Sequence, residues 1–232
     1  MLDPAGRVAM ISGASRGIGQ AIAARLRARG YRISAGARTV GSIEVAEDVL
    51  VARYDAERAE DAAAWVEATM ARFRRIDAVV NAAGISTPRV RLDDDDETAL
   101  DGMWRVNVKG PLRVIRAALP HLRAGGEGRV INIASLSGKR VANENFGYAM
   151  SKFALIALTQ AVRREGWDAG IRATALCPGF VATDMTAYVT TAPREAMTRP
   201  EDIAVLAETL LLLPNTATIG ELLVNWRLEP ML

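Results

Sequence analysis

The stretch from Arg7 to Gly19, RVAMISGASRGIG, decides the fold. Its first half, Arg7 to Ser12, is a short apolar run typical of a strand that is buried on both faces of a sheet. Three glycines follow this strand: Gly13, Gly17 and Gly19. Apolar residues at helical spacing come next: Ile18, Ile22 and Leu26. A strand, a glycine turn and a helix N-terminus in this order predict a phosphate-binding cradle, because backbone N–H groups and the helix dipole point at the anion.

The spacing of these glycines differs from G-x-G-x-x-G, and a flexible surface turn is the alternative that a glycine triplet alone leaves open. With the strand before it and the helix after it, we interpret the turn as a cofactor loop. The residues expected to contact the cofactor here are Gly13, Ser15, Arg16, Gly17, Ile18 and Gly19.

The end of the second strand, Tyr31 to Ala37, indicates which cofactor the loop serves. Dinucleotide folds place a ribose-reading residue at this point, an acid for a free 2′-hydroxyl or an arginine for a 2′-phosphate. Here the strand closes on Arg38, and Arg16 is available from the glycine loop. Two guanidinium groups and no carboxylate favour NADP(H) over NAD(H), unless both arginines are simply solvated.

The remaining chain alternates strands with helices. Further strands are expected at Val49 to Tyr54, Ala78 to Val80, Gly128 to Ala134, Ile171 to Leu176 and Glu221 to Asn225. Helices are expected from Arg58 onward, from Thr98 to about Arg123, from Tyr148 to Trp167 and from Glu201 to Leu213. This alternation predicts a doubly wound α/β sheet of parallel strands with helices on both faces, in a single domain over residues 1–232. The segment from Thr39 to Val49 is too short for a full crossover helix.

Ligands of open parallel sheets bind beyond the carboxyl ends of the strands, so residues there are candidates for the site. Asp55 closes the third strand and is expected either to contact adenine or to cap the next helix. Small residues at the end of the fourth strand leave room for a cofactor: Asn81, Ala82, Ala83 and Gly84. Ser135 ends the fifth strand and should line the same crevice.

A phenol and an ammonium, Tyr148 and Lys152, stand four residues apart where the chain is expected to be helical. Residues at this spacing share a helix face. A tyrosine titrates near pH ~10, so it is a poor proton donor or acceptor at neutral pH unless a nearby cation stabilises the phenolate. The pair therefore predicts an acid/base site, and a half-buried Tyr148 with a solvated Lys152 on an ordinary amphipathic helix is the alternative.

Composition excludes several other classes of protein. A net charge of +2 and 5% aromatic residues indicate neither a nucleic-acid surface nor a strongly charged membrane face. The single cysteine, Cys177, excludes an intrachain disulfide, and no residues gather at metal-ligand spacing. Five consecutive acids, Asp93 to Glu97, are interpreted as a solvated helix start. The first residues lack the features of a signal peptide, and no apolar run reaches membrane-spanning length, so we expect a cytoplasmic protein.

Taken together, these residues resemble the short-chain dehydrogenase/reductase family over nearly the whole chain. The matching residues are Gly13, Gly17, Gly19, Asn81 to Gly84, Asn107, Ser135, Tyr148, Lys152, Pro178, Gly179 and Thr183. The resemblance implies a seven-stranded Rossmann sheet and hydride transfer between a nicotinamide and a carbonyl or alcohol. It also implies cofactor contacts from Asn81, Ala82, Gly84, Tyr148, Lys152, Pro178, Gly179 and Thr183.

The same resemblance implies a role for each of four catalytic residues. Tyr148 is the general acid or base, and Lys152 holds the nicotinamide ribose while lowering the Tyr148 pKa. Ser135 hydrogen-bonds the substrate oxygen, and Asn107 holds a water that links Lys152 to solvent. The sequence places Pro111 four residues after Asn107, where a proline bends the expected helix.

Three departures from the family pattern concern residues outside this set of four. Ala82 stands where a second Asn is common, and Ser12 replaces a usual Thr whose local hydrogen bond it can still make. The tail from Asn225 to Leu232 lacks the common Asp-Gly-Gly ending, which leaves the substrate open. A non-catalytic nicotinamide-nucleotide sensor is the alternative function, although such a protein would be expected to lose Tyr148 or Lys152.

The expected partners are a small carbonyl or alcohol substrate and further copies of the chain. The helices at Trp104 to Leu122 and Tyr148 to Trp167 carry more apolar positions than one buried face needs. The family commonly pairs these helices, so we expect a homo-oligomer, a tetramer or a dimer. Nucleic acid and membrane are not expected as partners.

Overall fold

One parallel sheet organises the computed structural model, which describes residues 1–142 and 144–228. Its seven strands are β1 (Val8–Ser12), β2 (Arg32–Ala37), β3 (Val49–Arg53), β4 (Ala78–Asn81), β5 (Arg129–Ile133), β6 (Arg172–Pro178) and β7 (Glu221–Val224). They pair in the order β3-β2-β1-β4-β5-β6-β7, every pair parallel. The chain reverses its direction across the sheet between β1 and β4, and parallel sheets bind ligands at such a switch point. The predicted fold class is confirmed.

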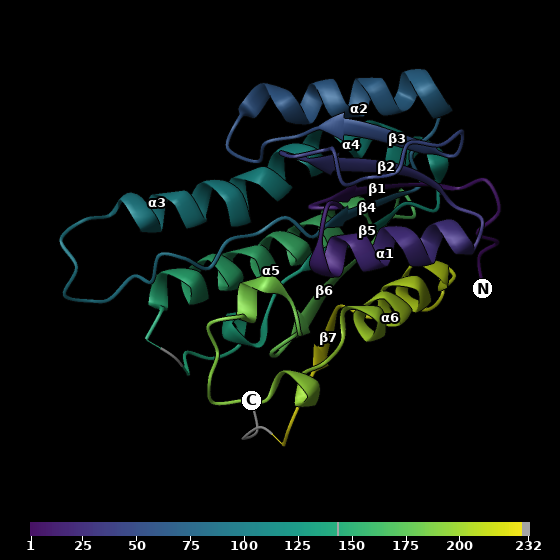
Figure 1. The fold of residues 1–232 in the computed structure, drawn as a ribbon. Coiled ribbons are helices and arrows are strands. Elements are labelled where there is room, and N and C mark those ends of the chain that lie inside the picture. The colour runs from purple at the N-terminus through teal and green to yellow at the C-terminus, as the bar shows by residue number, and fades with distance from the viewer. Residues whose placement is uncertain (143, 229–232) are drawn as a thin grey trace.

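Helices cover both faces of this sheet, as Figure 1 shows. They are α1 (Gly17–Ala28), α2 (Ala59–Phe73), α3 (Thr98–Trp104), α4 (Gly110–Gly125), α5 (Phe146–Gly166) and α6 (Pro200–Leu212). Successive side chains of a strand point to opposite faces, so Ile11 packs with α1 and α6 whereas Met10 packs with α2 and α4. All five residues of β1 are buried, which explains its unbroken apolar run.

The helix predicted from Thr98 to Arg123 is interrupted by one π-helical turn, Arg105–Lys109. Pro111 has no N–H, so it cannot bond the carbonyl four residues back, at Asn107. Gly110 N–H instead bonds the Arg105 carbonyl, five residues back. The turn holds Asn107 fully buried between α3 and α4. A π turn inside a long helix commonly marks a functional site.

Helices α1 and α6 lie side by side on one face of the sheet, although they come from opposite ends of the chain (Figure 1). Ile22 and Leu26 of α1 share a buried cluster with Ile203 and other residues of α6. The Glu208 carboxylate of α6 is buried and forms salt bridges with the guanidinium groups of Arg25 and Arg29 in α1. The helix that follows the glycine turn therefore depends on α6 for its packing.

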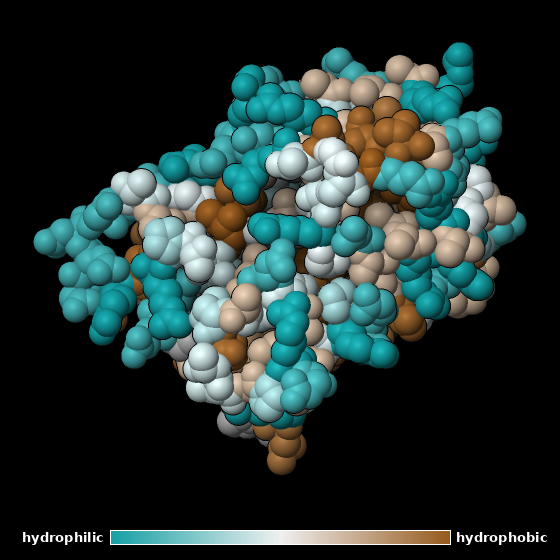
Figure 2. Space-filling model, viewed as in Figure 1, coloured by the Kyte–Doolittle hydropathy of each residue, from teal (hydrophilic) through white to brown (hydrophobic). Residues whose placement is uncertain are grey.

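The acidic run that the sequence predicted to be solvated lies on the surface. Residues Asp93 to Glu97 are exposed, and the loop that carries them forms a hydrophilic projection at the left of Figure 2. Within the described residues, no group of His, Cys, Asp or Glu is placed to hold a metal ion, and no helix is long and apolar enough to span a membrane. Residues 38–48 contain no helix, as their length predicted.

Candidate active site

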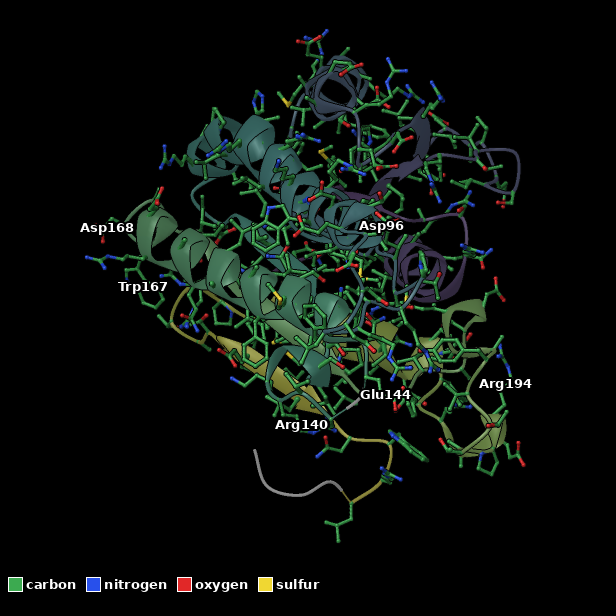
Figure 3. All side chains as sticks on the ribbon, turned by 90° about the vertical axis from the view of Figure 1, so that its left-hand side faces the viewer. Asp96, Arg140, Glu144, Trp167, Asp168 and Arg194 are labelled. Carbon is green, nitrogen blue, oxygen red and sulfur yellow. The ribbon has the colours of Figure 1, made fainter. Side chains whose placement is uncertain are left out.

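A cavity of about 480 Å³ lies at the carboxyl ends of the strands. Figure 3 views the molecule from the side toward which the strands point, where Glu144 precedes α5 and Arg194 lies between β6 and α6. Eleven of the residues predicted to contact a cofactor line this cavity: Gly13, Ser15, Arg16, Gly17, Ile18, Gly19, Arg38, Asp55, Ala82, Gly84 and Thr183. Segments far apart in the chain therefore meet where the sequence predicted one crevice.

The glycines of the turn are required by close backbone approach. Gly13 has a φ of +69°, and a Cβ there would lie 2.8 Å from the Ala83 nitrogen. A Cβ on Gly19 would collide with the Gly13 carbonyl oxygen. Gly17 has a φ of +56° and faces the Thr183 side chain, 3.2 Å from where its Cβ would lie. Larger residues would strain or fill this cradle.

The start of α1 suits a phosphate group. Arg16, the residue that precedes the helix, has an extended backbone and makes no side-chain capping bond, and the first turn carries no acid. The first N–H groups of a helix have no partner within it, and here they border the cavity. Their dipole and the glycine cradle therefore fit the pyrophosphate of a dinucleotide.

Hydroxyl and guanidinium groups gather at the end of the cavity beside β2. Arg16, Arg38, Thr39 and Ser42 all line it. Ser42 Oγ donates to the Ser15 carbonyl at 3.2 Å, while Arg16 Nη1 lies 3.4 Å from Asp184 Oδ2 in an exposed ion pair. The sequence analysis did not predict Thr39 and Ser42, although two hydroxyl residues within four positions of Arg38 were a usable signal.

Asp55 borders the cavity but does not cap α2. Its Oδ1 accepts from the Glu57 N–H at 3.0 Å, and Arg58 is the residue that precedes the helix. Of the two alternatives for Asp55, the helix cap is therefore wrong.

The Asn81 side chain points away from the cavity. Its Nδ2 donates to Asn132 Oδ1 at 2.8 Å, and Asn132 Nδ2 donates to Thr159 Oγ1 of α5 at 2.8 Å. This buried chain ties β4 to β5 and α5, so the structure gives the Asn81 side chain a structural role. The backbone after it is held by Ser12, whose hydroxyl accepts from the N–H groups of Ala82 and Ala83, as predicted.

Pro178 and Gly179 also lie outside the residues that line the cavity. Pro178 is the buried last residue of β6. A Cβ on Gly179 would lie 2.8 Å from Cδ1 of Trp226, which the tail places over it. Residues Glu229 to Leu232 of that tail lie outside the described residues.

Lys152 is buried, with 4% of its surface exposed, which excludes the alternative of a solvated lysine. Its Nζ donates to the Ile133 carbonyl at 2.8 Å and lies 5.5 Å from the centroid of the Tyr148 ring. Gly84 lines the cavity, and a Cβ on it would lie 3.7 Å from Lys152 Nζ, so the ammonium lies just behind this glycine. The lysine thus stands at the boundary between the cavity and Tyr148.

Burial dominates the titration of both groups. It raises the pKa of Tyr148 to about 12, against a hydrogen bond with Ser135 that lowers it, and the phenol of Tyr188 raises it further. Burial also lowers the pKa of Lys152 to about 8. Lys152 is not among the groups that account for the Tyr148 shift, so the predicted lowering of the Tyr148 pKa by Lys152 stays a prediction.

Ser135 and Asn107 both lie close to this pair, Ser135 at Tyr148 and Asn107 at Gly84 beside Lys152. Ser135 follows β5, and its hydroxyl accepts from the Ser137 N–H at 3.0 Å. Asn107 Oδ1 accepts from the Ile85 N–H at 2.9 Å, and its Nδ2 donates to the Ile85 carbonyl and to Ser151 Oγ. Both amide hydrogens of Asn107 are thereby used, so its side chain braces the segment after Gly84.

Asn145, which the sequence analysis did not predict, positions the helix that carries Tyr148. It precedes α5, and its Oδ1 accepts from the N–H groups of Tyr148 at 3.3 Å and Val90 at 3.2 Å. Its Nδ2 donates to the Ser86 carbonyl at 2.7 Å. An asparagine three residues before Tyr148 was a recognisable helix-capping signal.

Comparison with known proteins agrees with this geometry. The family model described as short chain dehydrogenase matches residues 7–194. An agropine synthesis reductase of Rhizobium rhizogenes is 45% identical over 91% of this chain, which spans about half, 50%, of that protein's length. A 3-ketoacyl-(acyl-carrier-protein) reductase from Brucella melitensis, solved with NADH, has a TM-score of 0.88 at 26% identity, covering 96% of this chain and 98% of its own. An alcohol dehydrogenase from Thermococcus sibiricus, solved with 5-hydroxy-NADP, has a TM-score of 0.84 at 31% identity, covering 94% and 95%.

Proposed function

The chain belongs to the short chain dehydrogenase family, and we propose that it is an NADP(H)-dependent oxidoreductase acting on a carbonyl compound or secondary alcohol. One observation carries the proposal. Tyr148, Ser135 and the buried ammonium of Lys152 lie together behind Gly84, which lines a cavity that fits a dinucleotide. A nucleotide sensor, the alternative function, has no use for a buried lysine beside a phenol, since burying the charge costs stability.

The nicotinamide cofactor, when bound, supplies or accepts the hydride. Ser135 and Tyr148 hold the substrate oxygen, and Tyr148 donates its proton to that oxygen in reduction or takes it in oxidation. Lys152 holds the nicotinamide ribose and adds positive charge beside the phenol, which favours the phenolate. Asn107, held in place by its side-chain hydrogen bonds to Ile85 and Ser151, holds a water that links Lys152 to solvent and returns its proton.

Consumption of NADPH across a panel of ketones tests the activity itself. Because the agropine synthesis reductase is a reductase by name, the reducing direction is the first to assay. Loss of NADPH absorbance that requires both ketone and protein supports the proposal. Tight NADPH binding without turnover of any ketone or alcohol would favour the sensor.

The cytoplasm stays the expected location of the protein, a prediction that rests on the sequence alone.

We expect the protein to prefer NADP(H) because Arg16 and Arg38 line the cavity beside the hydroxyls of Thr39 and Ser42. Losing one arginine paired with a phosphate costs roughly 1.5 to 3 kcal/mol, so Arg38→Asp should weaken NADPH binding by about tenfold to a hundredfold and spare NADH. Fluorescence titration of both cofactors measures this. The exposed Arg123, on the far part of α4, provides the matched control Arg123→Asp. Equal binding of NADH and NADPH by the unmodified protein would show that the arginines are misassigned.

We also expect an oligomer, a tetramer or dimer, built on α5. Met150 and Phe153 are 47% and 45% exposed on one face of this helix, and Trp104 of α3 is 38% exposed. Phe153→Glu should place a charge in the interface and yield monomers. Light scattering distinguishes these from the 24.9 kDa monomer mass. Val45→Glu, at a 76% exposed apolar residue far from α5 in sequence, is the control. An unmodified protein of monomer mass contradicts the prediction.

A further inference from the structure

A cation stacked on an aromatic ring joins two segments beside Tyr148. The guanidinium carbon of Arg89 lies 5.3 Å from the ring centroid of Tyr188. Arg89 follows the segment that Gly84 begins, and Tyr188 belongs to the residues between β6 and α6. Asn145 accepts hydrogen bonds from the N–H groups of Val90, the residue after Arg89, and of Tyr148, so the backbone of Arg89 lies close to the start of the helix that carries the catalytic phenol. The phenol of Tyr188 also raises the pKa of Tyr148.

Arg89 differs from the cations around it in what it contacts. Arg91 pairs with Asp93 at 3.6 Å, and Lys139 pairs with Glu221 at 2.6 Å. Arg194 donates to the carbonyls of Ala182 and Thr183. Within residues 1–142 and 144–228, Arg89 has the Tyr188 ring and no carboxylate within ion-pair distance. Its positive charge is thus available to a ligand.

The backbone that carries Arg89 is fixed on both sides. Asn145 bonds the Ser86 carbonyl and the Val90 N–H, and Val90 is buried. The same asparagine caps the helix of Tyr148. The contact with the Tyr188 ring restricts the motion of the guanidinium, and a restricted guanidinium loses less entropy when it binds an anion. The arrangement is therefore suited to a carboxylate, which guanidinium binds through two parallel hydrogen bonds.

We propose that Arg89, stacked on Tyr188, binds a carboxylate of the carbonyl substrate, so that the substrates of this protein are keto acids. This inference rests on the proposed function, since it places the acid group in the same site as the reacting carbonyl. It identifies a specificity subsite, and it adds no step to the reaction.

A series of keto acids and their neutral esters tests the subsite. We would assay 4-oxopentanoate, 5-oxohexanoate and 6-oxoheptanoate against their methyl esters, since the spacing between the carbonyl and the acid group decides whether both ends can be held. The expected result is an acid-over-ester ratio of kcat/KM of about tenfold or more at the best length, within the range of charge-assisted hydrogen bonds. Arg89→Gln should reduce that ratio by about tenfold, to near one.

Three variants separate the subsite from general surface charge. Arg91→Gln removes a neighbouring cation that already has a partner, and it should keep the acid preference. Tyr188→Leu should weaken the preference because the guanidinium loses its platform, whereas Tyr188→Phe keeps the ring and should retain it. A wild-type ratio near one, or a ratio that Arg89→Gln leaves unchanged, overturns the inference.

Calorimetry keeps the inference testable apart from turnover. Each acid is titrated into protein saturated with NADP⁺, and unmodified protein should bind the best acid at least tenfold more tightly than the Arg89→Gln variant. Reduction of esters and acids with equal efficiency would overturn the subsite while the proposed function stands. Absence of any reduction would count against the proposed function. The calorimetric comparison would then decide the subsite, because equal binding of the acid by the unmodified protein and the Arg89→Gln variant would overturn it.

Discussion

A Tyr148→Phe variant should lose about a hundredfold or more in kcat, the usual effect of removing a positioned acid or base. Its affinity for NADPH should stay nearly unchanged, because the phenyl ring can pack where the phenol packs. Only the hydroxyl that Ser135 contacts is lost. Steady-state turnover of the best ketone, with a fluorescence titration of NADPH, measures both quantities.

Tyr31→Phe is the matched control for this loss. Tyr31 is 1% exposed in the core, and within the described residues its hydroxyl has no hydrogen-bond partner. The control removes the same atom from a buried tyrosine outside the cavity and should leave turnover intact. Ser135→Ala should weaken turnover while sparing NADPH binding. A Tyr148→Phe protein with near wild-type kcat would overturn the mechanism, even with the fold and the cofactor site unaffected.

Replacing Lys152 by methionine should abolish turnover and yet stabilise the cofactor-free protein. Burial lowers the pKa of this ammonium from 10.5 to about 8. At pH 7 that difference destabilises the fold by about 3 kcal/mol. Methionine removes this cost and leaves the Ile133 carbonyl without its donor, a loss of about 1 to 2 kcal/mol. The net gain at pH 7 should be about 1 to 2 kcal/mol.

The stability difference between the unmodified protein and the Lys152→Met variant should change with pH in a defined direction. Because the folded pKa of Lys152 is the lower one, the unfolded chain binds more protons between about pH 8 and 10.5, and stability rises with pH across that window. Relative to the Lys152→Met variant, the unmodified protein should therefore gain stability from pH 8 upward, and the advantage of the variant should vanish between about pH 9 and pH 10. Urea unfolding of both proteins at several pH values measures this. A constant difference across the window would mean that Lys152 is not buried as an ammonium.

Much of the fold was predictable because its causes are local. A buried parallel strand requires a continuous apolar run, and Val8–Ser12 is one. The glycines at positions 13, 17 and 19 are required by close approaches and positive φ values within one short turn, so the turn could be predicted before the sheet was known. The pair of Tyr148 and Lys152 was likewise predictable from helical spacing alone.

Other properties depend on contacts between distant segments. The Tyr148 pKa rises because several elements bury the phenol, which spacing along one helix cannot reveal. The direction of the Asn81 side chain follows from the pairing of β4 with β5, where Asn132 stands opposite it. The contact between Arg89 and Tyr188 joins residues about a hundred positions apart, and neither residue carries a local signal for the other.

The packing of α1 against α6 has a consequence for how the chain folds during synthesis. The carboxylate that pairs with Arg25 belongs to Glu208, 183 positions later, and Ile22 and Leu26 are covered by the same late helix. While a ribosome is still making the second half of the chain, the finished glycine turn and its helix have no such cover. The apolar side of α1 must stay exposed, or be shielded by a chaperone, until α6 emerges. The glycine turn and α1 are therefore synthesised early but packed late, so productive folding follows the synthesis of the C-terminal third.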